Sequence, residues 1–359
     1  MIQLAKPYFD GKELENVKAC LDSGYVSEGP MAAKFSGQVK ELVGSKFAIP
    51  VTSCTAALWL SLKALHVGPG DDVVVPAYTY PATANVVEDL GANVVFCDVD
   101  ELTYNARFDQ IVDAVTPHTK AVIPVHLFGL MSTEMARLKD FCEENEIFII
   151  EDAACSMGAK FKGMNAGTVG DIGCYAFHAR KVVTTGEGGM CVTDNPVLDE
   201  RLRLLKRFGW DGKRDFVLPG LNFKMADILA AVGSAQMDKV GQIIEGRRGV
   251  AKYYSKVLKD MDNVMVPFEP DGAYHLYQAY VCQLDEDVNR DKVIEMMRSR
   301  GVECQVGTYN VAGTTAFKDV VAEVPVSERL FRQSLALPCW YGLKKTELEL
   351  VVKSLKEVI

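Results

Sequence analysis

The sequence predicts an α/β protein with a mostly parallel sheet in a large domain and a smaller α+β domain at the C-terminus. Three observations lead to this prediction. Short apolar runs rich in β-branched residues recur along the first half of the chain, amphipathic segments separate them, and a long charged stretch follows from about residue 225. Apolar runs this continuous are typical of strands buried on both faces of a parallel sheet.

The elements of the large domain follow from these patterns in order. The amphipathic stretch after residue 53 is expected to begin a helix, because Ser and Thr favour the position before the first helical turn. The segment 135–145 has helical periodicity and a charged outer face, as a crossover helix requires. Four buried strands are expected at residues 73–75, 94–96, 121–123 and 147–150.

The C-terminal third has a different sequence pattern. One long helical stretch is expected from about 225 to 258, linking the two domains. Beyond it we expect a strand at 280–284 and helices at 291–299 and 348–358. We place the boundary near Gly241, so that residues 1–240 form the large domain and 241–359 the small one.

Composition excludes several classes of protein. The chain of 359 residues is 48% hydrophobic and 24% charged, which suits a globular protein with a sizeable core. It has no run of about 18 apolar residues and no signal-peptide core, so we expect a cytoplasmic protein without a membrane partner. Its ten cysteines form no Cys-x-x-Cys pair, which favours reduced thiols over a metal site. A net charge of -9 disfavours nonspecific binding to nucleic acid.

Lys181 and Asp152 are the two residues whose chemistry is most informative. An aldehyde cofactor needs a primary amine on the protein as its anchor, and its pyridine nitrogen needs a carboxylate partner. Lys181 precedes the glycine-rich run at 186–189, and Asp152 ends an apolar run, where open α/β sheets bind ligands. A lysine alone is more often a solvated surface charge. Together the two residues indicate a site for pyridoxal phosphate.

The segments around this pair resemble a known family in sequence and in order. The block from residue 151 to 193 contains EDAACSMGA, GDIGCYAFH and the lysine with its glycine-rich turn, and six shorter segments match elsewhere: 24–30 (GYVSEGP), 53–58 (SCTAAL), 76–80 (PAYTY), 124–129 (PVHLFG), 222–225 (NFKM) and 336–338 (ALP). The chain resembles the DegT/DnrJ/EryC1/StrS family of pyridoxal-phosphate-dependent sugar aminotransferases over nearly its whole length. The resemblance implies the type I aminotransferase fold, with a large-domain sheet of the seven-stranded type.

The resemblance also implies roles for individual residues. Lys181 is the catalytic residue and the covalent anchor of the cofactor, and Asp152 faces the pyridine nitrogen. Tyr80 stacks on the cofactor ring. Backbone amides of Thr55 and Ala56, at a helix start, bind the phosphate.

The cofactor phosphate and the substrate have further expected partners. The family's counterpart of Asn222 reaches the phosphate from the other subunit, which implies a homodimer with a shared active site. Gly29, in the loop at 24–30, and Tyr309 correspond to the sugar-binding region. Alternatively, Asn222 is an ordinary helix cap or turn residue, and Tyr309 is a tyrosine packed in a surface loop.

Two cofactor-binding positions depart from the family pattern. Cys155 stands where the family commonly has glutamine or histidine near the ring hydroxyl, and a thiol donates only weakly. Ala176 stands where the family usually has a serine that binds the phosphate. Phosphate binding is therefore expected to depend more on backbone amides and on Asn222.

The function implied is transfer of an amino group from glutamate to a nucleotide-linked keto-sugar, a step typical of polysaccharide biosynthesis. Lys181 would serve as covalent anchor and as general acid/base, and we expect burial and cationic neighbours to depress its pKa. Amination at C3 or at C4, and a cyclitol ketone as acceptor, are all compatible with the resemblance.

Two alternatives stay open from sequence. A sugar dehydratase of this fold has histidine in place of the lysine, so Lys181 disfavours that function. A non-catalytic regulatory or binding homologue draws some support from Ala176 and Cys155. The phosphate fingerprints of dinucleotide-binding dehydrogenases and of P-loop kinases do not occur.

Overall fold

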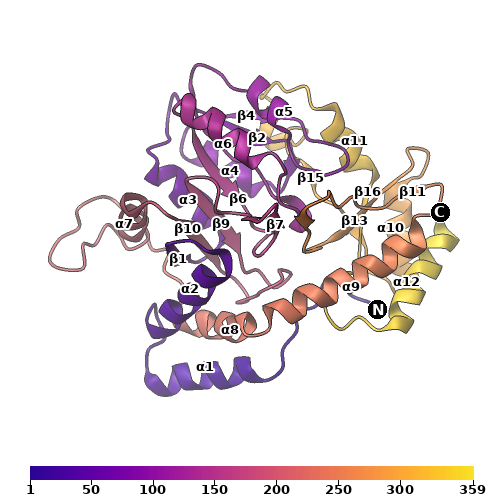
Figure 1. The fold of residues 1–359 in the computed structure, drawn as a ribbon, viewed down its shortest axis with the longest axis horizontal. Helices are drawn as coiled ribbons and strands as arrows, with labels where there is room; N and C mark the ends of the chain where they lie inside the picture. The colour runs from indigo at the N-terminus through magenta and orange to yellow at the C-terminus, as the bar shows by residue number, and fades with distance from the viewer.

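A seven-stranded sheet forms the centre of the large half of the molecule (Figure 1). The computed structural model describes residues 1–359. In spatial order the strands are β1 (Phe47–Val51), β10 (Gly189–Thr193), β9 (Ile172–Ala176), β6 (Phe148–Asp152), β5 (Thr119–Val122), β2 (Asp72–Pro76) and β4 (Asn93–Cys97). Only β10 runs against its neighbours, and all other adjacent pairs are parallel. The mostly parallel sheet and its four expected strands are confirmed.

Helices cover both faces of this sheet, which explains the continuous apolar runs. Along β2, Val74 belongs to one hydrophobic cluster while Val73 and Val75 belong to the other, because successive side chains point to opposite faces. The first cluster includes residues from α2 (Pro30–Val43), α5 (Phe108–Asp113), α6 (Met135–Glu144) and α8 (Asp227–Met237). The second includes residues from α3 (Cys54–Ala64), α4 (Ala82–Asp89) and α7 (Pro196–Leu205).

The expected helical stretch from 225 to 258 is two helices and not one. α8 ends at Met237, and α9 (Val240–Leu258) starts after Lys239, whose ψ of 12° departs from helical geometry. α8 packs against α1 (Lys12–Ser23) on the large half, and α9 then runs toward the small half (Figure 1). The domain boundary near Gly241 falls in the first turn of α9 and stays a prediction.

The small half is a four-stranded antiparallel sheet covered by helices. Its strands, in spatial order, are β11 (Val264–Met265), β13 (Tyr280–Leu284), β16 (Ser334–Leu337) and β14 (Gln305–Val306). Its helices are α10 (Arg290–Ser299), α11 (Pro325–Gln333) and α12 (Lys345–Val358). The strand and two helices expected in this region are confirmed.

Two small sheets and two short 3-10 helices complete the fold. β12 (Ala273–Tyr274), β7 (Lys160–Phe161) and β8 (Met164–Asn165) form one sheet, and β15 (Tyr309–Asn310) pairs with β3 (Tyr78–Thr79) in the other. The 3-10 helices are η1 (Leu127–Gly129) and η2 (Thr315–Phe317). Because β3 belongs to the large half, the β3–β15 pairing joins the two halves beside the carboxyl ends of the central strands.

The segment between α7 and α8 extends away from the body of the molecule (Figure 1). It exposes large apolar side chains to solvent: Phe208, Phe216, Val217 and Leu221. Such residues on a projecting segment are typical of a surface that is covered in an assembly. No helix combines the length and apolarity needed to cross a bilayer.

Candidate active site

A cleft of about 740 Å³ opens at the carboxyl ends of the central strands, between the two halves of the molecule. Seven of the ten residues predicted for the site line it: Thr55, Tyr80, Asp152, Cys155, Ala176, Lys181 and Tyr309. They come from segments spread over more than two thirds of the sequence. The fold therefore brings the predicted amine, carboxylate and aromatic ring to one place.

Lys181 lies in the connection between two antiparallel strands, β9 and β10. Ala176 and Gly189 are register partners at the ends of these strands, so the connection leaves and re-enters the sheet at one point. The Lys181 Nζ lies 3.0 Å from the Cys155 Sγ. Burial acts to lower the pKa of Lys181, but the neighbouring Cys155, Cys54 and Asp152 outweigh it, and the pKa is raised. The direction is opposite to the expected depression.

Asp152 is buried at the end of β6 with its carboxylate held in place. Its Oδ2 accepts a hydrogen bond from the Thr83 hydroxyl at 2.8 Å, and its Oδ1 accepts one from the Ala154 amide at 3.1 Å. Thr83 comes from α4 and also lines the cleft. The sequence analysis missed Thr83, which follows Tyr80 by three residues and so stands one turn further along the chain.

A buried hydrogen-bonded pair, His126 and Glu151, lies next to Asp152. The His126 Nε2 lies 2.6 Å from the Glu151 Oε2, and both side chains are inaccessible to solvent. The Ser132 amide donates to the His126 Nδ1, so Nε2 carries the proton that is shared with Glu151. Burial acts to raise the pKa of Glu151, but His126 and backbone amides outweigh it, and the pKa is lowered.

The amides that hold Glu151 belong to the chain between β8 and β9. Its carboxylate accepts hydrogen bonds from the Gly167, Val169 and Gly170 N–H groups at 2.6–2.8 Å. The backbone N–H of His126 donates a hydrogen bond to the Asp152 carbonyl at 3.0 Å. These contacts fix the backbone that carries Asp152.

The start of α3 lies at the cleft, and one of its backbone amides already donates a hydrogen bond within the protein. Ser53 caps the helix, and its hydroxyl accepts a hydrogen bond from the Ala56 N–H at 3.1 Å. Ala56 is buried, whereas Thr55 and Cys54 line the cleft. The first turn therefore presents Thr55 more directly than Ala56 to an anion.

Gly189 explains why the chain needs glycine beside this turn. A Cβ at position 189 would lie 2.3 Å from the Ser53 carbonyl carbon and oxygen, which is far inside contact distance. The Ser53 turn and the end of the lysine connection thus pack backbone against backbone. This close approach sets the position of the α3 start relative to Lys181.

Tyr80 and Tyr309 stand together at the cleft wall. Their ring centroids are 6.3 Å apart in an edge-to-face arrangement, and Tyr80 is 65% exposed. The β3–β15 pairing, in which Tyr309 is opposite Thr79, brings them together. A large aromatic face left open to a cleft is well placed to receive a planar ligand.

Besides the buried Ala56, two predicted residues do not line this cleft. Gly29 caps α2, and its N–H donates to the Asp227 carboxylate at 2.7 Å. Asn222 is exposed on the projecting segment, where its Oδ1 accepts a hydrogen bond from Lys224 at 2.5 Å. Within one subunit neither residue contributes to the site around Lys181.

The chain just before Lys181 is held from the small half, which the sequence analysis did not foresee. The Arg180 carbonyl accepts hydrogen bonds from the Gln278 side chain at 2.7 Å and from the Arg247 guanidinium at 3.5 Å. Arg247 is buried in α9 and also donates to the Cys339 carbonyl at 2.8 Å. No sequence motif marks Arg247, because its partners are main-chain carbonyls distant in sequence.

The donor set fits a group that carries an aldehyde, a pyridine nitrogen and a phosphate. Lys181 supplies a primary amine, Asp152 a buried carboxylate, Tyr80 an open aromatic face, and the α3 start a positive helix end. Ala176 and Cys155 line the cleft without adding a hydroxyl or amide. The chain contains no cluster of His, Cys, Asp and Glu that could hold a metal ion.

Comparison with known proteins gives consistent relatives. Residues 7–356 match the model of the DegT/DnrJ/EryC1/StrS aminotransferase family. The chain is 32% identical to GDP-perosamine synthase from Caulobacter vibrioides, covering 100% of this chain and 98% of the relative. It is also 32% identical to dTDP-4-dehydro-2,3,6-trideoxy-D-glucose 4-aminotransferase from Saccharopolyspora spinosa, covering 100% and 97%. The PLP form of Spr1654 from Streptococcus pneumoniae superposes with a TM-score of 0.93 at 26% identity, covering 99% of this chain and 98% of that one.

Proposed function

Because the chain belongs to the DegT/DnrJ/EryC1/StrS aminotransferase family, we propose that it transfers an amino group to a nucleotide-linked keto-sugar, with pyridoxal phosphate as cofactor. The observation that carries the proposal is the placement of Lys181 and Asp152 in one cleft, beside the start of α3. The names of the two relatives point to nucleotide-linked sugars as products or substrates. The amino donor we propose is glutamate.

Each residue of the cleft would bind a different part of the cofactor. Lys181 would hold the aldehyde carbon, Asp152 the pyridine nitrogen and Tyr80 one face of the ring. The phosphate would lie at the start of α3, against the amide of Thr55. The cofactor, when bound, withdraws electrons from the substrate carbon next to the amino group and so makes its proton removable.

The protein's part in the reaction is to hold groups and to move one proton. The Lys181 amine would be the group that carries the proton taken from the substrate carbon, acting as general base and then as general acid. Thr83 and the Ala154 amide donate hydrogen bonds to the Asp152 carboxylate, and these contacts would hold it in place beside the pyridine nitrogen. The Arg180 carbonyl, held by Gln278, fixes the backbone from which Lys181 extends.

The second subunit would complete the phosphate site. Asn222 is exposed on the segment between α7 and α8, which also exposes apolar side chains, and it does not line its own cleft. In a homodimer this segment would reach the neighbouring cleft and place Asn222 at the phosphate. Ala176 offers no hydroxyl there, so Asn222 carries a larger share of phosphate binding.

Borohydride reduction followed by peptide mapping tests the assignment of Lys181. The reductant fixes the cofactor to the amine that holds it, and the label is expected on the peptide containing Lys181. The Lys181→Ala variant should carry no label, and Lys160→Ala, an exposed lysine outside the cleft, should be labelled as the wild type is. A label on another lysine of the wild type would refute the assignment.

The transfer itself is tested with the cofactor-loaded protein and L-glutamate. We expect the visible absorbance of the cofactor to shift and one equivalent of 2-oxoglutarate to appear per site. Adding a nucleotide-linked keto-sugar should make the release of 2-oxoglutarate continuous. A protein that binds the cofactor without any response to glutamate would instead be a binding homologue.

A further inference from the structure

Two nucleophilic side chains, the Cys155 thiol and the Lys181 amine, are in direct contact in the cofactor cleft. The Lys181 Nζ donates a hydrogen bond to the Cys155 Sγ at 3.0 Å, and both residues line the cleft. They are 26 positions apart in the chain, so the fold creates the contact. Because Cys155 departs from the family pattern, the family resemblance assigns no role to this pair.

The thiols that solvent can reach are confined to this cleft. Eight of the ten cysteines are buried, and the two that are partly exposed, Cys54 and Cys155, both line the cofactor cleft. Oxidation of a thiol requires that the oxidant reach the sulfur. A small oxidant from solvent is therefore expected to act on these two thiols before the other eight.

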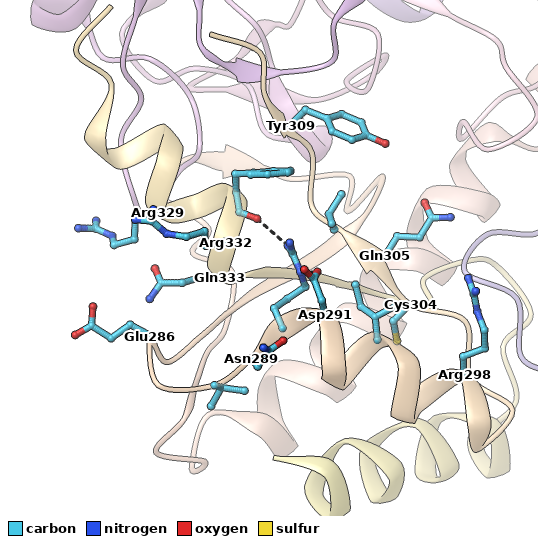
Figure 2. A pocket seen from close by; sticks show the side chains of 15 residues that line it. Glu286, Asn289, Asp291, Arg298, Cys304, Gln305, Tyr309, Arg329, Arg332 and Gln333 are labelled. Carbon is cyan, nitrogen blue, oxygen red and sulfur yellow. Dashed lines mark hydrogen bonds and ion pairs between the residues drawn. The ribbon is translucent and has the colours of Figure 1, made fainter. Parts of the chain in front are cut away.

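The cofactor cleft adjoins a second cleft of about 720 Å³ on the small half of the molecule (Figure 2). Gln305, Val306 and Tyr309 line both clefts, and Figure 2 shows Tyr309 at the upper edge of the second. The partner subunit that we propose at the phosphate would lie at the start of α3, on the large half. Cys155 and Lys181 belong to one subunit, so their contact does not depend on the dimer. We expect a molecule as small as hydrogen peroxide to reach the thiol through this side of the cleft.

Backbone contacts on both sides hold the thiol and the amine together. The residue after the thiol is Ser156, whose hydroxyl donates a hydrogen bond to the His126 carbonyl at 2.6 Å. The residue before the amine is Arg180, whose carbonyl accepts a hydrogen bond from the Gln278 side chain at 2.7 Å. Reacting groups that are held in contact react much faster than the same groups free in solution.

We propose that hydrogen peroxide joins Cys155 and Lys181 through a reversible bond between Sγ and Nζ. In the first step the sulfur attacks one peroxide oxygen, the O–O bond breaks, and a sulfenic acid and one water form. In the second step the neutral amine attacks the sulfur, and the S–O bond breaks. The hydroxyl leaves as water with a proton from the nitrogen. The sulfur is oxidised by two electrons in total, and the peroxide is reduced to water.

The bond would control access to the proposed cofactor anchor, and this consequence rests on the proposed function. While Nζ is bonded to sulfur it cannot hold the cofactor aldehyde. Two molecules of a thiol reductant break the S–N bond, and the products are the free thiol, the free amine and the disulfide of the reductant. Cofactor already bound to the amine would prevent the second step, so oxidation closes only a site that is empty of cofactor aldehyde.

Mass spectrometry of the full-length, cofactor-free protein after treatment with hydrogen peroxide tests the bond. We expect the protein to become lighter by two hydrogen atoms and the peptide containing Cys155 to be joined to the peptide containing Lys181. Dithiothreitol should separate the two peptides and restore the mass. In protein loaded with pyridoxal phosphate before the treatment, the joined peptide should be lost.

Three variants identify the reacting atoms. Cys155→Ala should give no joined peptide, whereas Cys54→Ala should give as much as the wild type does. In Lys181→Ala the sulfenic acid has no amine to attack it, and dimedone should trap it on Cys155. Circular dichroism verifies that each variant is folded. Oxidation of wild-type Cys155 to a disulfide with Cys54 or to a sulfinic acid, without the joined peptide, would overturn the proposal. Equal joining in protein unfolded by urea would do the same.

Cofactor loading separates this proposal from the proposed function. The fraction of protein that takes up pyridoxal phosphate, followed by absorbance, should fall in proportion to the joined fraction and recover with dithiothreitol. Full uptake by fully joined protein would overturn Lys181 as the anchor of the proposed function, while the S–N bond would stand.

Discussion

The Lys181 Nζ and the Cys155 Sγ lie 3.0 Å apart, and both residues line the cleft. This contact pairs the proposed anchoring amine with a residue that departs from the family pattern. Because Cys155 is the largest of the influences that raise the pKa of Lys181, it favours the ammonium form, which cannot attack an aldehyde. We therefore expect this neighbour to slow the attack of the amine on the cofactor aldehyde.

Replacement of Cys155 by alanine should speed cofactor loading. The pKa of Lys181 falls when this neighbour is removed, so a larger fraction of the amine is neutral at a given pH. We expect the pH profile of the loading rate, followed by absorbance, to move to lower pH. Cys20→Ala, a buried thiol outside the cleft, is the matched control, and an identical profile in Cys155→Ala would contradict the proposed role.

Thr83→Val should weaken cofactor binding by about ten- to a hundredfold, because a hydrogen bond to a charged group contributes roughly 1.5–3 kcal/mol. The substitution keeps the shape of the side chain but removes the donor to Asp152. Thr83→Ser retains the hydroxyl and should bind nearly as the wild type does. Spectrophotometric titration of the cofactor-free proteins measures both affinities, and equal values for valine and serine would show that the hydroxyl is dispensable.

Glu151→Gln should lower the free energy of unfolding at neutral pH by about 1.5–3 kcal/mol, because the buried carboxylate accepts hydrogen bonds from His126 and from three backbone amides that an uncharged amide replaces only in part. The pKa of Glu151 is lowered in the folded protein, so its contribution is present above the unfolded value of 4.5 and is lost as the pH falls through the folded value. The difference from wild type should therefore shrink in acid.

Urea unfolding at a series of pH values measures this dependence. Glu144→Gln removes an exposed carboxylate at the end of α6 and should change stability little at any pH. A difference between Glu151→Gln and wild type that stays constant down to low pH would exclude the ionised Glu151 carboxylate as its source.

Gly189→Ala should disturb the cofactor site and destabilise the fold by about 1–3 kcal/mol, because the new methyl group meets the Ser53 backbone. Gly249→Ala is the contrasting substitution, since a Cβ at this exposed position of α9 meets nothing within 4 Å. It should stabilise the helix by about 0.5–1 kcal/mol. Thermal melting with and without cofactor compares the two, and equal melting temperatures would refute the proposed crowding at Ser53.

Mixing two inactive variants should restore activity if the active site is shared. Lys181→Ala lacks the anchor, and Asn222→Ala lacks the residue proposed to reach the neighbouring cleft. After subunit exchange of equal amounts, about a quarter of all sites would combine an intact lysine with an intact asparagine. Activity that stays at the sum of the two separate variants, in a mixture shown to contain hybrid dimers, would place Asn222 outside the partner's site.

The central sheet could be predicted from the sequence because each of its strands carries its own signal. The run at 147–150 is apolar without interruption, and burial on both faces is the physical cause. The break between α8 and α9 could not be predicted in this way, since Asp238 and Lys239 are ordinary polar residues within a helical pattern. Tertiary packing overrides local propensity at such a point.

The residues of the cleft divide in the same way, into those that a local sequence signal marks and those that only the fold brings together. Lys181, Asp152 and Tyr80 were found because motifs adjacent in sequence mark them. Thr83, Gln278 and Arg247 were missed because each acts on a partner that only the fold brings near. The predicted lowering of the Lys181 pKa was wrong for a related reason. The thiols and the carboxylate that raise this pKa lie far from Lys181 in sequence.

The antiparallel course of β10 has a consequence for the mechanics of the site. The connection that carries Lys181 is clamped at both ends by neighbouring central strands, with Ala176 opposite Gly189. Slippage of one strand by a single residue would turn every side chain of that strand to the other face of the sheet. Both ends of this connection are thus held in the central sheet, and backbone amides of β9 and β10 should be among the last to exchange with deuterium.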